Sequence, residues 1–494
     1  MSNAQHMCIG EEVSRALVQV RRVLGERSVE CYLTGGFVRD AMLRRATDDI
    51  DVVVSGNALE LARCVADGLN ARCIPLNEPN QIARVMLPPQ GHLHLDFATM
   101  RGAIDEDLRL RDYTINAMAI GLDEALAGSP AFIDPLDGRR DLESRRIRAV
   151  SESVLQEDPA RLIRGPRFAA ELGFSIDEET RTFIRRNSSL IGHVARERVR
   201  DELCRILAMP KAAQWVRLLD DLGLLLTVIP ELAAAKGVEQ PREHFWDVFD
   251  HLVETVSAVE FLLRLDGADH WGEPVRCVAP WSQELEEHFR EEVSGGRARA
   301  TLLKVAALLH DIAKPQTKSV EDNGRTRFFG HAQEGAAIAE GILRRLRFST
   351  REAEMVKTMV EHHMRPGQMG DDMPTRRAIY RYFRDTGDVG LDTIFLNLAD
   401  HLAARGPLLD SEQWRAHASS MAYVIAESTS EQSVVAPPKL IDGHDLINSY
   451  GMSPGPEIGE LLDAVREAQA AGEVSSREEA LALVERLLYD RQKS

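Results

Sequence analysis

The sequence predicts an α+β fold, in which a mixed β-sheet near the N-terminus is followed by an all-helical remainder. Residues 31–54 predict a strand, a Gly-Gly turn, a helix and a second strand, and further strand-like segments follow at 72–76, 82–87 and 93–98. From about residue 154 a helical pattern of apolar residues runs to about residue 235, and helices carry nearly all of the rest. A chain of 494 residues is too long for a single core, so several domains are expected.

Breaks in composition divide this chain into four predicted domains. Gly237 and Pro241 interrupt the helical pattern, a polar and turn-forming segment lies at 318–328, and a Pro- and Ser-containing segment at 428–438 is typical of a linker. The predicted domains are a mixed α/β head at 1–150, a helical neck at 151–236, a third helical domain at 237–427 and a helical tail at 428–494.

Composition places the chain among globular proteins of a reducing compartment. Hydrophobic residues make up 44% and charged residues 28%, and no apolar run is long enough to span a bilayer, so no membrane partner is expected. The N-terminal residues show no secretory signal, and the six cysteines are scattered without a C-x-x-C pair. A cytoplasmic protein is predicted, and its oligomeric state stays open.

Charge is unevenly distributed along the sequence. The net charge of −18 argues against nucleic acid as a partner, because phosphate binding depends largely on Lys and Arg. Residues 181–217, however, contain nine basic and only three acidic residues. This stripe is interpreted either as a solvated helical face or as a surface that follows an RNA backbone. The candidate RNA-binding residues are Arg185, Arg196, Arg198 and Arg200.

The second predicted strand begins with two acids. Asp49 and Asp51 are separated by one residue, so both side chains point to the same face of the strand. Two acids on one face are costly unless a cation joins them, and hard Mg²⁺ suits such oxygen ligands. Two divalent ions held in this way serve an in-line displacement at a triphosphate. The alternative is an ordinary strand end that carries two surface acids.

The Gly-Gly turn precedes these acids by about a dozen residues. Gly35 and Gly36 allow the backbone to approach a phosphate closely at the start of a helix. Arg39, one turn into that helix, can reach the same anion. Neither the glycine pair nor the D-x-D pattern is specific by itself.

Five motifs in a fixed order are far more specific than either pattern alone. They are LTGGFVRD at 33–40, DID at 49–51, RDYTINAMA at 111–119, DPLDGRRDL at 134–142 and EDPARLIR at 157–164. In this order they resemble the class II tRNA nucleotidyltransferase and bacterial poly(A) polymerase family, of the polymerase-β-like superfamily, over roughly residues 30–235. The resemblance implies a nucleotidyltransferase head that adds CMP and AMP, from CTP and ATP, to the 3′ end of tRNA, with Mg²⁺ as cofactor.

Residue roles follow from the resemblance position by position. It implies that Asp49 and Asp51 bind Mg²⁺ and that Gly36 and Arg39 touch the nucleotide. The residues implied along the nucleotide cleft are Arg111, Asp112 and Asn116, with Arg164 near the triphosphate and Glu157, Asp158 and Arg161 on a base-reading helix. Asp158 and Arg161 have i, i+3 spacing, which would place an acceptor beside donors that match the edge of C or A. The alternative is a surface ion pair.

Two features after the second acid affect the predicted product. Asp96 lies on another predicted strand and is interpreted either as a third catalytic carboxylate or as a strand-end acid. Only ten residues, 97–106, separate it from Asp107, whereas many CCA-adding relatives carry a longer loop that is associated with the switch from C to A. Full CCA addition is predicted, with CC addition alone as the alternative.

A second constellation occupies residues 237–405. The order H…HD…H…H…D resembles the HD phosphohydrolase superfamily, whose helical fold gathers these residues around one or two metal ions. The candidate ligands are His251, His310, Asp311, His331, His362 and Asp400, with His363 left open as the alternative to His362. Imidazoles with carboxylates suit Mn²⁺, Ni²⁺, Fe²⁺ or Zn²⁺.

Two alternatives from other functional classes remain. One is a metal phosphohydrolase that acts on RNA ends or nucleotides and whose head is a degraded relic, which the retained motif residues argue against. The other is a poly(A) polymerase, which is disfavoured because the last residues balance their charges instead of forming a basic extension.

Overall fold

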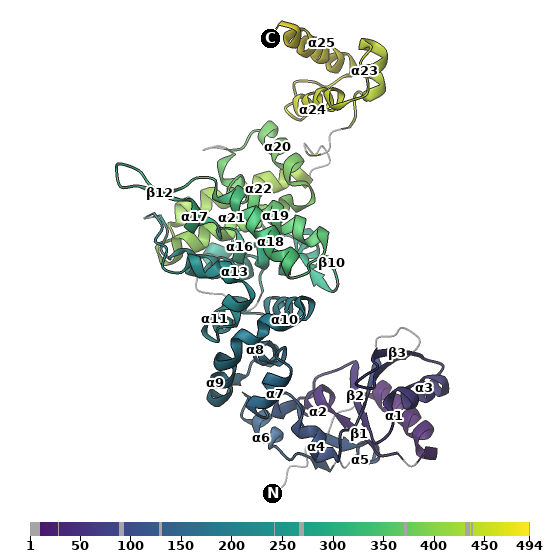
Figure 1. Ribbon diagram of the computed structural model, residues 1–494. Helices are drawn as coiled ribbons and strands as arrows, with labels where there is room; N and C mark the ends of the chain where they lie inside the picture. Colours follow the sequence, from purple (N-terminus) through teal and green to yellow (C-terminus); the bar gives the residue numbers. More distant parts are fainter. Residues whose placement is uncertain are drawn as a thin grey trace. The chain divides into compact units, whose positions relative to one another are not determined.

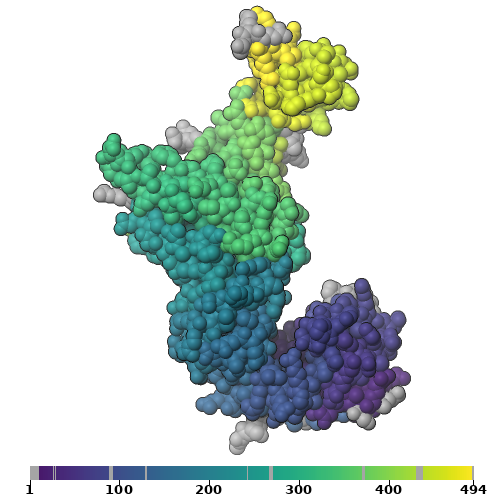
Figure 2. Space-filling model, in the orientation of Figure 1, coloured from purple at the N-terminus to yellow at the C-terminus, as the bar shows by residue number. Residues whose placement is uncertain are grey.

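A computed structural model describes residues 10–493 except for 28, 88–92, 128–130, 242, 266–270, 370–372, 430–434, 436 and 437. The chain divides into two compact units, one containing residues 1–194 and 221–227 and the other containing residues 195–220 and 228–494 (Figure 1). Figure 2 shows one face of the same chain in space-filling form. None of the described helices is long and apolar enough to cross a membrane.

A mixed seven-stranded sheet forms the centre of the first unit, as the sequence predicts. Its strands, in spatial order, are β3 (Arg72–Asn77), β4 (Ile82–Met86), β5 (His94–Thr99), β2 (Asp49–Val54), β1 (Cys31–Thr34), β6 (Ala119–Gly121) and β7 (Phe132–Ile133). Only the β2–β5 pair is parallel, and every other neighbouring pair is antiparallel. The hydrophobic residues Val52, Val53 and Val54 of β2 are buried, which fixes the strand in the core up to its acidic start.

Helices surround this sheet and continue through the neck. Those before residue 236 are α1 (Glu11–Leu24), α2 (Gly35–Met42), α3 (Ala58–Leu69), α4 (Ile104–Arg109), α5 (Leu122–Leu126), α6 (Gly138–Glu143), α7 (Glu152–Glu157), α8 (Arg161–Leu172), α9 (Glu178–Asn187), α10 (Arg196–Ala208), α11 (Ala212–Asp221) and α12 (Leu224–Val228). A short parallel pair, β8 (Arg146–Ile147) with β9 (Ser175–Ile176), interrupts the predicted helical run.

The second unit is built from helices around a buried centre. After residue 236 the helices are α13 (Val248–Leu262), α14 (Glu273–Arg276), α15 (Gln283–Arg290), α16 (Arg299–Leu309), α17 (Lys314–Thr317), α18 (His331–Arg345), α19 (Thr350–His362), α20 (Arg376–Thr386), α21 (Gly390–Arg405), α22 (Ser411–Thr429), α23 (Gly443–Tyr450), α24 (Pro456–Ala470) and α25 (Arg477–Lys493). Helix α16 is apolar on nearly every side and is buried. Its one lysine, Lys304, pairs with Glu260 at 2.9 Å, which satisfies both buried charges.

Two hairpins depart from the predicted all-helical second half. They are β10 (Glu292–Ser294) with β11 (Arg297–Ala298), and β12 (Lys318–Val320) with β13 (Thr326–Phe328). The first turns at Gly295 and Gly296, both with positive φ, which glycine adopts without steric cost. The second is the segment that the sequence predicts as a polar turn, and Figure 1 labels it β12. The α+β class is confirmed, because both hairpins are short and helices make up the rest of the second unit.

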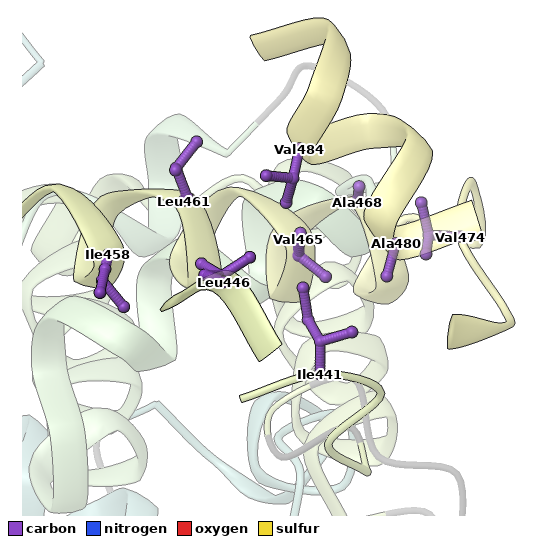
Figure 3. Packing of buried hydrophobic residues seen from close by; sticks show 9 residues of the cluster. All are labelled: Ile441, Leu446, Ile458, Leu461, Val465, Ala468, Val474, Ala480 and Val484. Carbon is purple, nitrogen blue, oxygen red and sulfur yellow. The ribbon is translucent and has the colours of Figure 1, made fainter. Parts of the chain in front are cut away.

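The tail has a hydrophobic core of its own. Side chains from α23, α24, α25 and the segments beside them form one cluster (Figure 3): Ile441, Leu446, Ile458, Leu461, Val465, Ala468, Val474, Ala480 and Val484. The predicted linker at 428–438 lies mostly outside the described residues. Ionic contacts join α24 to α20, where Arg377 and Arg381 both approach Glu467.

Candidate functional site

Three carboxylates and a histidine share one face of the sheet in the head. Strand β2 runs parallel to β5 in a register that places Asp49 opposite His94 and Asp51 opposite Asp96. Because side chains alternate along strands, these four groups point to the same face. One atom each from Asp49, His94 and Asp96 can be chosen so that all lie within 4.8 Å of one another. The face carries enough oxygen donors to fit divalent cations.

Asp51 is held by the glycine turn. The backbone N–H of Gly36 donates to Asp51 Oδ2 at 2.9 Å. Burial raises the pKa of Asp51, Arg111 opposes this rise, and Asp49 and Asp96 add to it, so that the pKa reaches about 6. Concentrated negative charge that is poorly compensated by the protein is a physical reason to expect a cation here.

Gly35→Ala is expected to lower nucleotide incorporation by at least about 100-fold, because a Cβ there would lie 2.4 Å from Asp51 Oδ2 and the residue has a φ of +66°. Gly36→Ala is the matched control: its Cβ would meet nothing closer than 3.5 Å, so a much smaller loss is expected. Incorporation of labelled CMP measures both. Equal losses in the two variants would contradict the role given to the Gly35 backbone.

A polar network joins the RDYTIN segment to helices α2 and α8. Asp112 accepts hydrogen bonds from the Tyr113 N–H at 2.7 Å and from Asn116 Nδ2 at 3.2 Å, and it pairs with Arg164 at 3.0 Å. Arg39 Nη1 donates to Asn116 Oδ1 at 2.8 Å. Burial opposes the charged form of Asp112, but Arg164 and these hydrogen bonds lower its pKa below its usual value. The structure thus brings four sequence-predicted nucleotide residues into direct contact.

Arg111 lies between this network and the acids. Its Nη2 is 3.5 Å from Asp107, and a Cβ added to Gly35 would meet both Arg111 Nη1 and Asp51. Its guanidinium is therefore placed beside Asp51, where it can meet an anion held near that carboxylate.

The start of the neck differs from the predicted continuous helix. Helix α7 ends at Glu157, which is exposed, and α8 begins at Arg161. Asp158 is extended, with φ −130° and ψ 91°, because the residue before Pro159 is driven out of the helical region. The prediction that Asp158 and Arg161 share one helical turn is wrong, since they flank a break between two helices.

Hydrogen bonds hold the break between α7 and α8, and one of them comes from the head. Tyr113 Oη donates to the carbonyl oxygen of Arg161 at 2.8 Å, and Arg161 Nη1 donates to the carbonyl oxygen of Val154 at 3.1 Å. Asp158 Oδ1 accepts from the Ala160 N–H at 3.3 Å. Both candidate base-reading side chains are half-buried and locally positioned.

The four candidate RNA-binding arginines fall in different units. Arg185, in the first unit, pairs with Asp221 at 2.6 Å. Arg196, Arg198 and Arg200 occupy the first turns of α10 in the second unit, and Arg200 Nε donates to Asp201 at 2.8 Å.

The HD constellation closes into a buried cluster in the second unit. His251 Nε2 lies 3.3 Å from Asp311 and 3.1 Å from Asp400, and His310 Nε2 lies 3.2 Å from Asp311. These four residues form one group of potential metal ligands. Burial opposes charge on His310, but the two carboxylates raise its pKa to about 10. Imidazoles beside carboxylates fit a divalent transition metal.

A second ligand group shares Asp311. His331 Nε2 is 3.3 Å and His363 Nε2 is 3.7 Å from Asp311 Oδ1, whereas the first group approaches Oδ2. His363 is 1% exposed, and burial lowers its pKa to about 4. His362 is half-buried and belongs to neither group. The choice of His362 is therefore corrected to His363, because residues about 100° apart around a helix cannot both face the cluster.

The cluster opens into a cleft of about 780 Å³. Asp311, His331, His363 and Asp400 line it. Basic side chains also line it: Lys314, Arg325, Arg327 and Arg405. Lys314 Nζ is 2.5 Å from Asp311 Oδ2. The cleft therefore offers both metal ligands and cations to an anionic substrate.

His363→Ala is expected to reduce bound metal by one ion per chain or to weaken its binding at least about tenfold, since it removes a nitrogen from a three-residue group. The adjacent His362→Ala should leave the metal content unchanged. Metal analysis of dialysed Mn²⁺-loaded protein compares the two. Loss of metal in His362→Ala alone would reverse the assignment.

Comparison with known proteins agrees with this layout. The chain is 34% identical over 460 residues to an A-adding tRNA nucleotidyltransferase of Deinococcus radiodurans, covering 92% of this chain and 94% of that protein. The chain belongs to the tRNA nucleotidyltransferase and poly(A) polymerase family. A CC-adding tRNA nucleotidyltransferase of Thermus thermophilus is also 34% identical, with 93% of each chain covered.

Family models match the same regions as the site residues of this nucleotidyltransferase. The Poly A polymerase head domain matches residues 31–148, and the HD domain matches residues 275–405. The model described as 'Probable RNA and SrmB- binding site of polymerase A' matches residues 173–236, and the model of tRNA nucleotidyltransferase domain 2 matches residues 411–484. The HD match begins after His251, although the structure brings that residue into the cluster.

Solved structures share the fold. The Thermotoga maritima CCA-adding enzyme complexed with tRNA matches with a TM-score of 0.61 and 22% identity, covering 98% of this chain and 97% of that one. A CCA-adding enzyme with CTP matches with a TM-score of 0.64 and 21% identity, covering 97% and 96%.

Sequence reasoning missed two polar residues of the head site. His94 Nε2 lies 3.1 Å from Asp49 Oδ1, and Arg84 binds both oxygens of Asp96, each at 2.7 Å. The alternation in L-H-L-D would have placed His94 on the face of Asp96, but the partner of either residue depends on strand pairing.

Proposed function

We propose that this chain adds CMP and AMP to the 3′ end of tRNA. In this reaction the terminal 3′-oxygen bonds to the α-phosphorus of CTP or ATP, the bond from that phosphorus to the bridging oxygen breaks, and pyrophosphate leaves. The observation that carries the proposal is the hydrogen bond from the Gly36 N–H to Asp51, whose carboxylate lies beside Asp49 and Arg111. Mg²⁺ bound there would neutralise the triphosphate and lower the pKa of the attacking hydroxyl.

Further residues of the head, together with Arg164 of the neck, position the nucleotide. Arg111 faces the acid cluster, and the linked side chains of Arg39, Asn116, Asp112 and Arg164 hold a fixed array of cations and amides near it. A preorganised array costs little reorganisation when a triphosphate binds. Such an array suits orientation of the leaving pyrophosphate.

We propose base reading by Asp158 and Arg161 at the α7–α8 break. Arg161→Ala is expected to reduce the preference for CTP over UTP by about tenfold or more, because donors to the base edge are lost. Competition between labelled CTP and unlabelled UTP measures the preference. Arg186→Ala, at an exposed ion pair with Glu152, is the control and should leave it unchanged. An unaltered preference in Arg161→Ala would contradict base reading.

CC addition alone is the second candidate, and a specific observation favours it. Strand β5 ends at Thr99 and α4 begins at Ile104, so the connection in this chain is short. One relative named A-adding and one named CC-adding are each 34% identical to this chain. The deciding experiment supplies tRNA that ends before CCA or before A, with labelled CTP and ATP separately. CMP incorporation into the first substrate together with AMP incorporation into the second supports full addition. CMP incorporation without AMP incorporation supports CC addition, and AMP incorporation without CMP incorporation supports A addition alone.

We also propose that the HD cluster is a metal phosphohydrolase centre, in which Asp311 would belong to both groups of metal ligands. Bound Mn²⁺, Ni²⁺, Fe²⁺ or Zn²⁺ would supply a nucleophilic hydroxide at neutral pH. The cations of the cleft would hold the phosphate of an RNA end or nucleotide. Hydrolysis of nucleotide phosphoesters by protein loaded with each metal tests this, and an inactive wild type with every metal would refute it.

The helical neck and compartment complete the proposal. We propose that Arg185, Arg196, Arg198 and Arg200 contact the tRNA backbone and that the enzyme works in the cytoplasm. The domains would be the head at 1–150, the neck at 151–236, the HD domain at 237–427 and the tail at 428–494. The separate core of the tail supports the last of these boundaries.

A further inference from the structure

The cleft beside the HD cluster has a polar wall that belongs to neither group of metal ligands. Helix α21 contributes Asn397, Asp400, His401, Ala404 and Arg405 to the lining of the cleft. Their spacing of three, one, three and one residues places them on one face of the helix. Asn397 and His401 therefore share a helix face with a member of the HD cluster and with one of the cations of the cleft.

Several polar atoms of this wall are buried and unpaired. They are Asn397 Oδ1, His401 Nε2, His417 Nε2 and His244 Nδ1, and none has a hydrogen-bond partner among the described residues. All four residues line the cleft. Asn397 is 7% exposed, and its Nδ2 already donates to the carbonyl oxygen of His363 at 2.9 Å, so only its oxygen is left to bind something else. A buried polar group without a partner is costly, and several in one cleft favour a site for a polar ligand.

Packing holds the two neighbouring imidazoles of the wall in place. The rings of His401 and His417 stack, with 4.6 Å between their centroids and 14° between their planes. Trp414 lies next to both rings, at 5.9 Å from His401 and 6.5 Å from His417. It is 1% exposed, and its Nε1 donates to the carbonyl oxygen of Val275 at 2.9 Å. The positions of the imidazole nitrogens are thus fixed before a ligand binds, which lowers the cost of binding.

The chemistry of the wall suits an uncharged hydroxyl group. Burial lowers the pKa of His417 to about 4, so at pH 7 its ring is neutral and can donate or accept, whereas the amide oxygen of Asn397 only accepts. Both Asn397 and His401 lie within one helical turn of Asp400, about 5 Å along the axis. In a nucleotide whose phosphate lies at the HD cluster, the sugar hydroxyl next to the ester oxygen is the polar group of the nucleoside nearest to phosphorus. The sugar therefore reaches this wall before the base does.

We propose that Asn397, His401 and His417 form a subsite for the ribose hydroxyl next to the phosphoester that the HD centre hydrolyses. The HD centre then selects ribonucleoside phosphoesters over 2′-deoxyribonucleoside phosphoesters. This inference rests on the proposed phosphohydrolase activity and names its substrate class. A site with buried groups that hydrogen-bond a substrate hydroxyl rejects the analogue without that hydroxyl, because its own groups then stay unpaired.

The test compares adenosine 3′-monophosphate, its 2′-deoxy analogue and p-nitrophenyl phosphate as substrates of the full chain loaded with Mn²⁺. In each reaction the oxygen of water bonds to phosphorus, the bond from phosphorus to the ester oxygen breaks, and phosphate and the protonated alcohol are released. We expect the wild-type kcat/KM for the ribonucleotide to exceed that for the 2′-deoxy analogue at least about tenfold. Equal values for the two nucleotides would overturn the inference.

Two substitutions of His417 separate hydrogen bonding from packing. His417→Phe keeps a ring that can stack on His401 but has no nitrogen, whereas His417→Gln loses the ring and keeps a polar group near the position of Nε2. We expect the preference for the ribonucleotide to be lost in His417→Phe and largely kept in His417→Gln. Hydrolysis of p-nitrophenyl phosphate and the metal content should stay unchanged in both. The opposite order would show that the ring only packs, and would overturn the inference.

The control is His444→Phe, at an exposed histidine of α23, which should keep the wild-type preference. A wild type that hydrolyses none of the three esters with any metal would refute the proposed phosphohydrolase activity instead. Isothermal titration of Mn²⁺-loaded protein with the two nucleotides then decides the subsite by itself. Tighter binding of the ribonucleotide that is lost in His417→Phe supports the subsite, and equal affinities in the wild type contradict it.

Discussion

Asp51→Asn is expected to lower nucleotide incorporation at least about 1,000-fold with little change in the fold. The amide keeps the shape of the carboxylate and an oxygen that can accept from the Gly36 N–H, but it loses the negative charge that holds a divalent ion. Several kcal/mol of transition-state stabilisation depend on such an ion, and each 1.36 kcal/mol corresponds to a tenfold rate. Single-turnover incorporation of CMP into tRNA lacking CCA measures the loss.

The control is Asp48→Asn, an exposed acid that precedes the first residue of β2. It should incorporate CMP at close to the wild-type rate. Activity of Asp51→Asn within tenfold of wild type would contradict the assigned metal role.

Asp51→Asn, which lowers activity, is expected to raise the stability of the metal-free protein. Because burial raises the folded-state pKa of Asp51 to about 6, above its ordinary 3.8, ionising it destabilises the folded metal-free protein as pH rises through that interval. Asp51→Asn should therefore stabilise metal-free protein at pH 7 by about 2 kcal/mol, and by nearly nothing at pH 3.5. The ratio of β2 amide protection in Asp51→Asn to that in wild type, measured at each of the two pH values by hydrogen exchange, gives this difference. An equal ratio at both would show that the carboxylate is not destabilising.

Asp311→Asn is expected to remove metal ions from the entire HD cluster and to abolish phosphoester hydrolysis there. Asp311 is the one residue common to both ligand groups, with Oδ2 facing His251 and His310 and Oδ1 facing His331. Losing its charge also leaves Lys314 without its partner at 2.5 Å. The lost negative charge of Asp311 and the positive charge left on Lys314 both oppose the binding of a metal cation at this buried site.

Metal analysis after dialysis of Mn²⁺-loaded protein gives the measurement. Asp410→Asn, at the exposed start of α22, is the control and should keep its metal. CMP incorporation by Asp311→Asn should stay at the wild-type level, because every residue assigned to the transfer site lies in the other compact unit. Retention of the full metal content would show that neither ligand group depends on Asp311. Circular dichroism of the variant shows whether a loss of metal comes with a lower unfolding temperature.

The sequence alone determined the chemistry of both sites. Alternation in D-I-D requires that Asp49 and Asp51 share a strand face, and the glycine pair before them predicts a close backbone approach to a phosphate. In the structure the Gly36 N–H donates to Asp51 at 2.9 Å. These are local relations, fixed by a few neighbouring residues. The first five strands of the mixed sheet and the helices of the second half were predictable for the same reason, since periodicity and turn residues act locally, whereas β6 and β7 were not predicted.

Only the tertiary structure decided which distant groups meet. The choice between His362 and His363 depends on which side of α19 faces α13, α16 and α21, and packing buries His363. The pairing of Arg84 with Asp96 and of His94 with Asp49 depends on the register of three strands, which no single strand encodes. The α7–α8 break was signalled by Pro159, yet the helical pattern on either side concealed it. Strand register and helix packing therefore decide which of the candidate residues lie close together, and the local sequence does not.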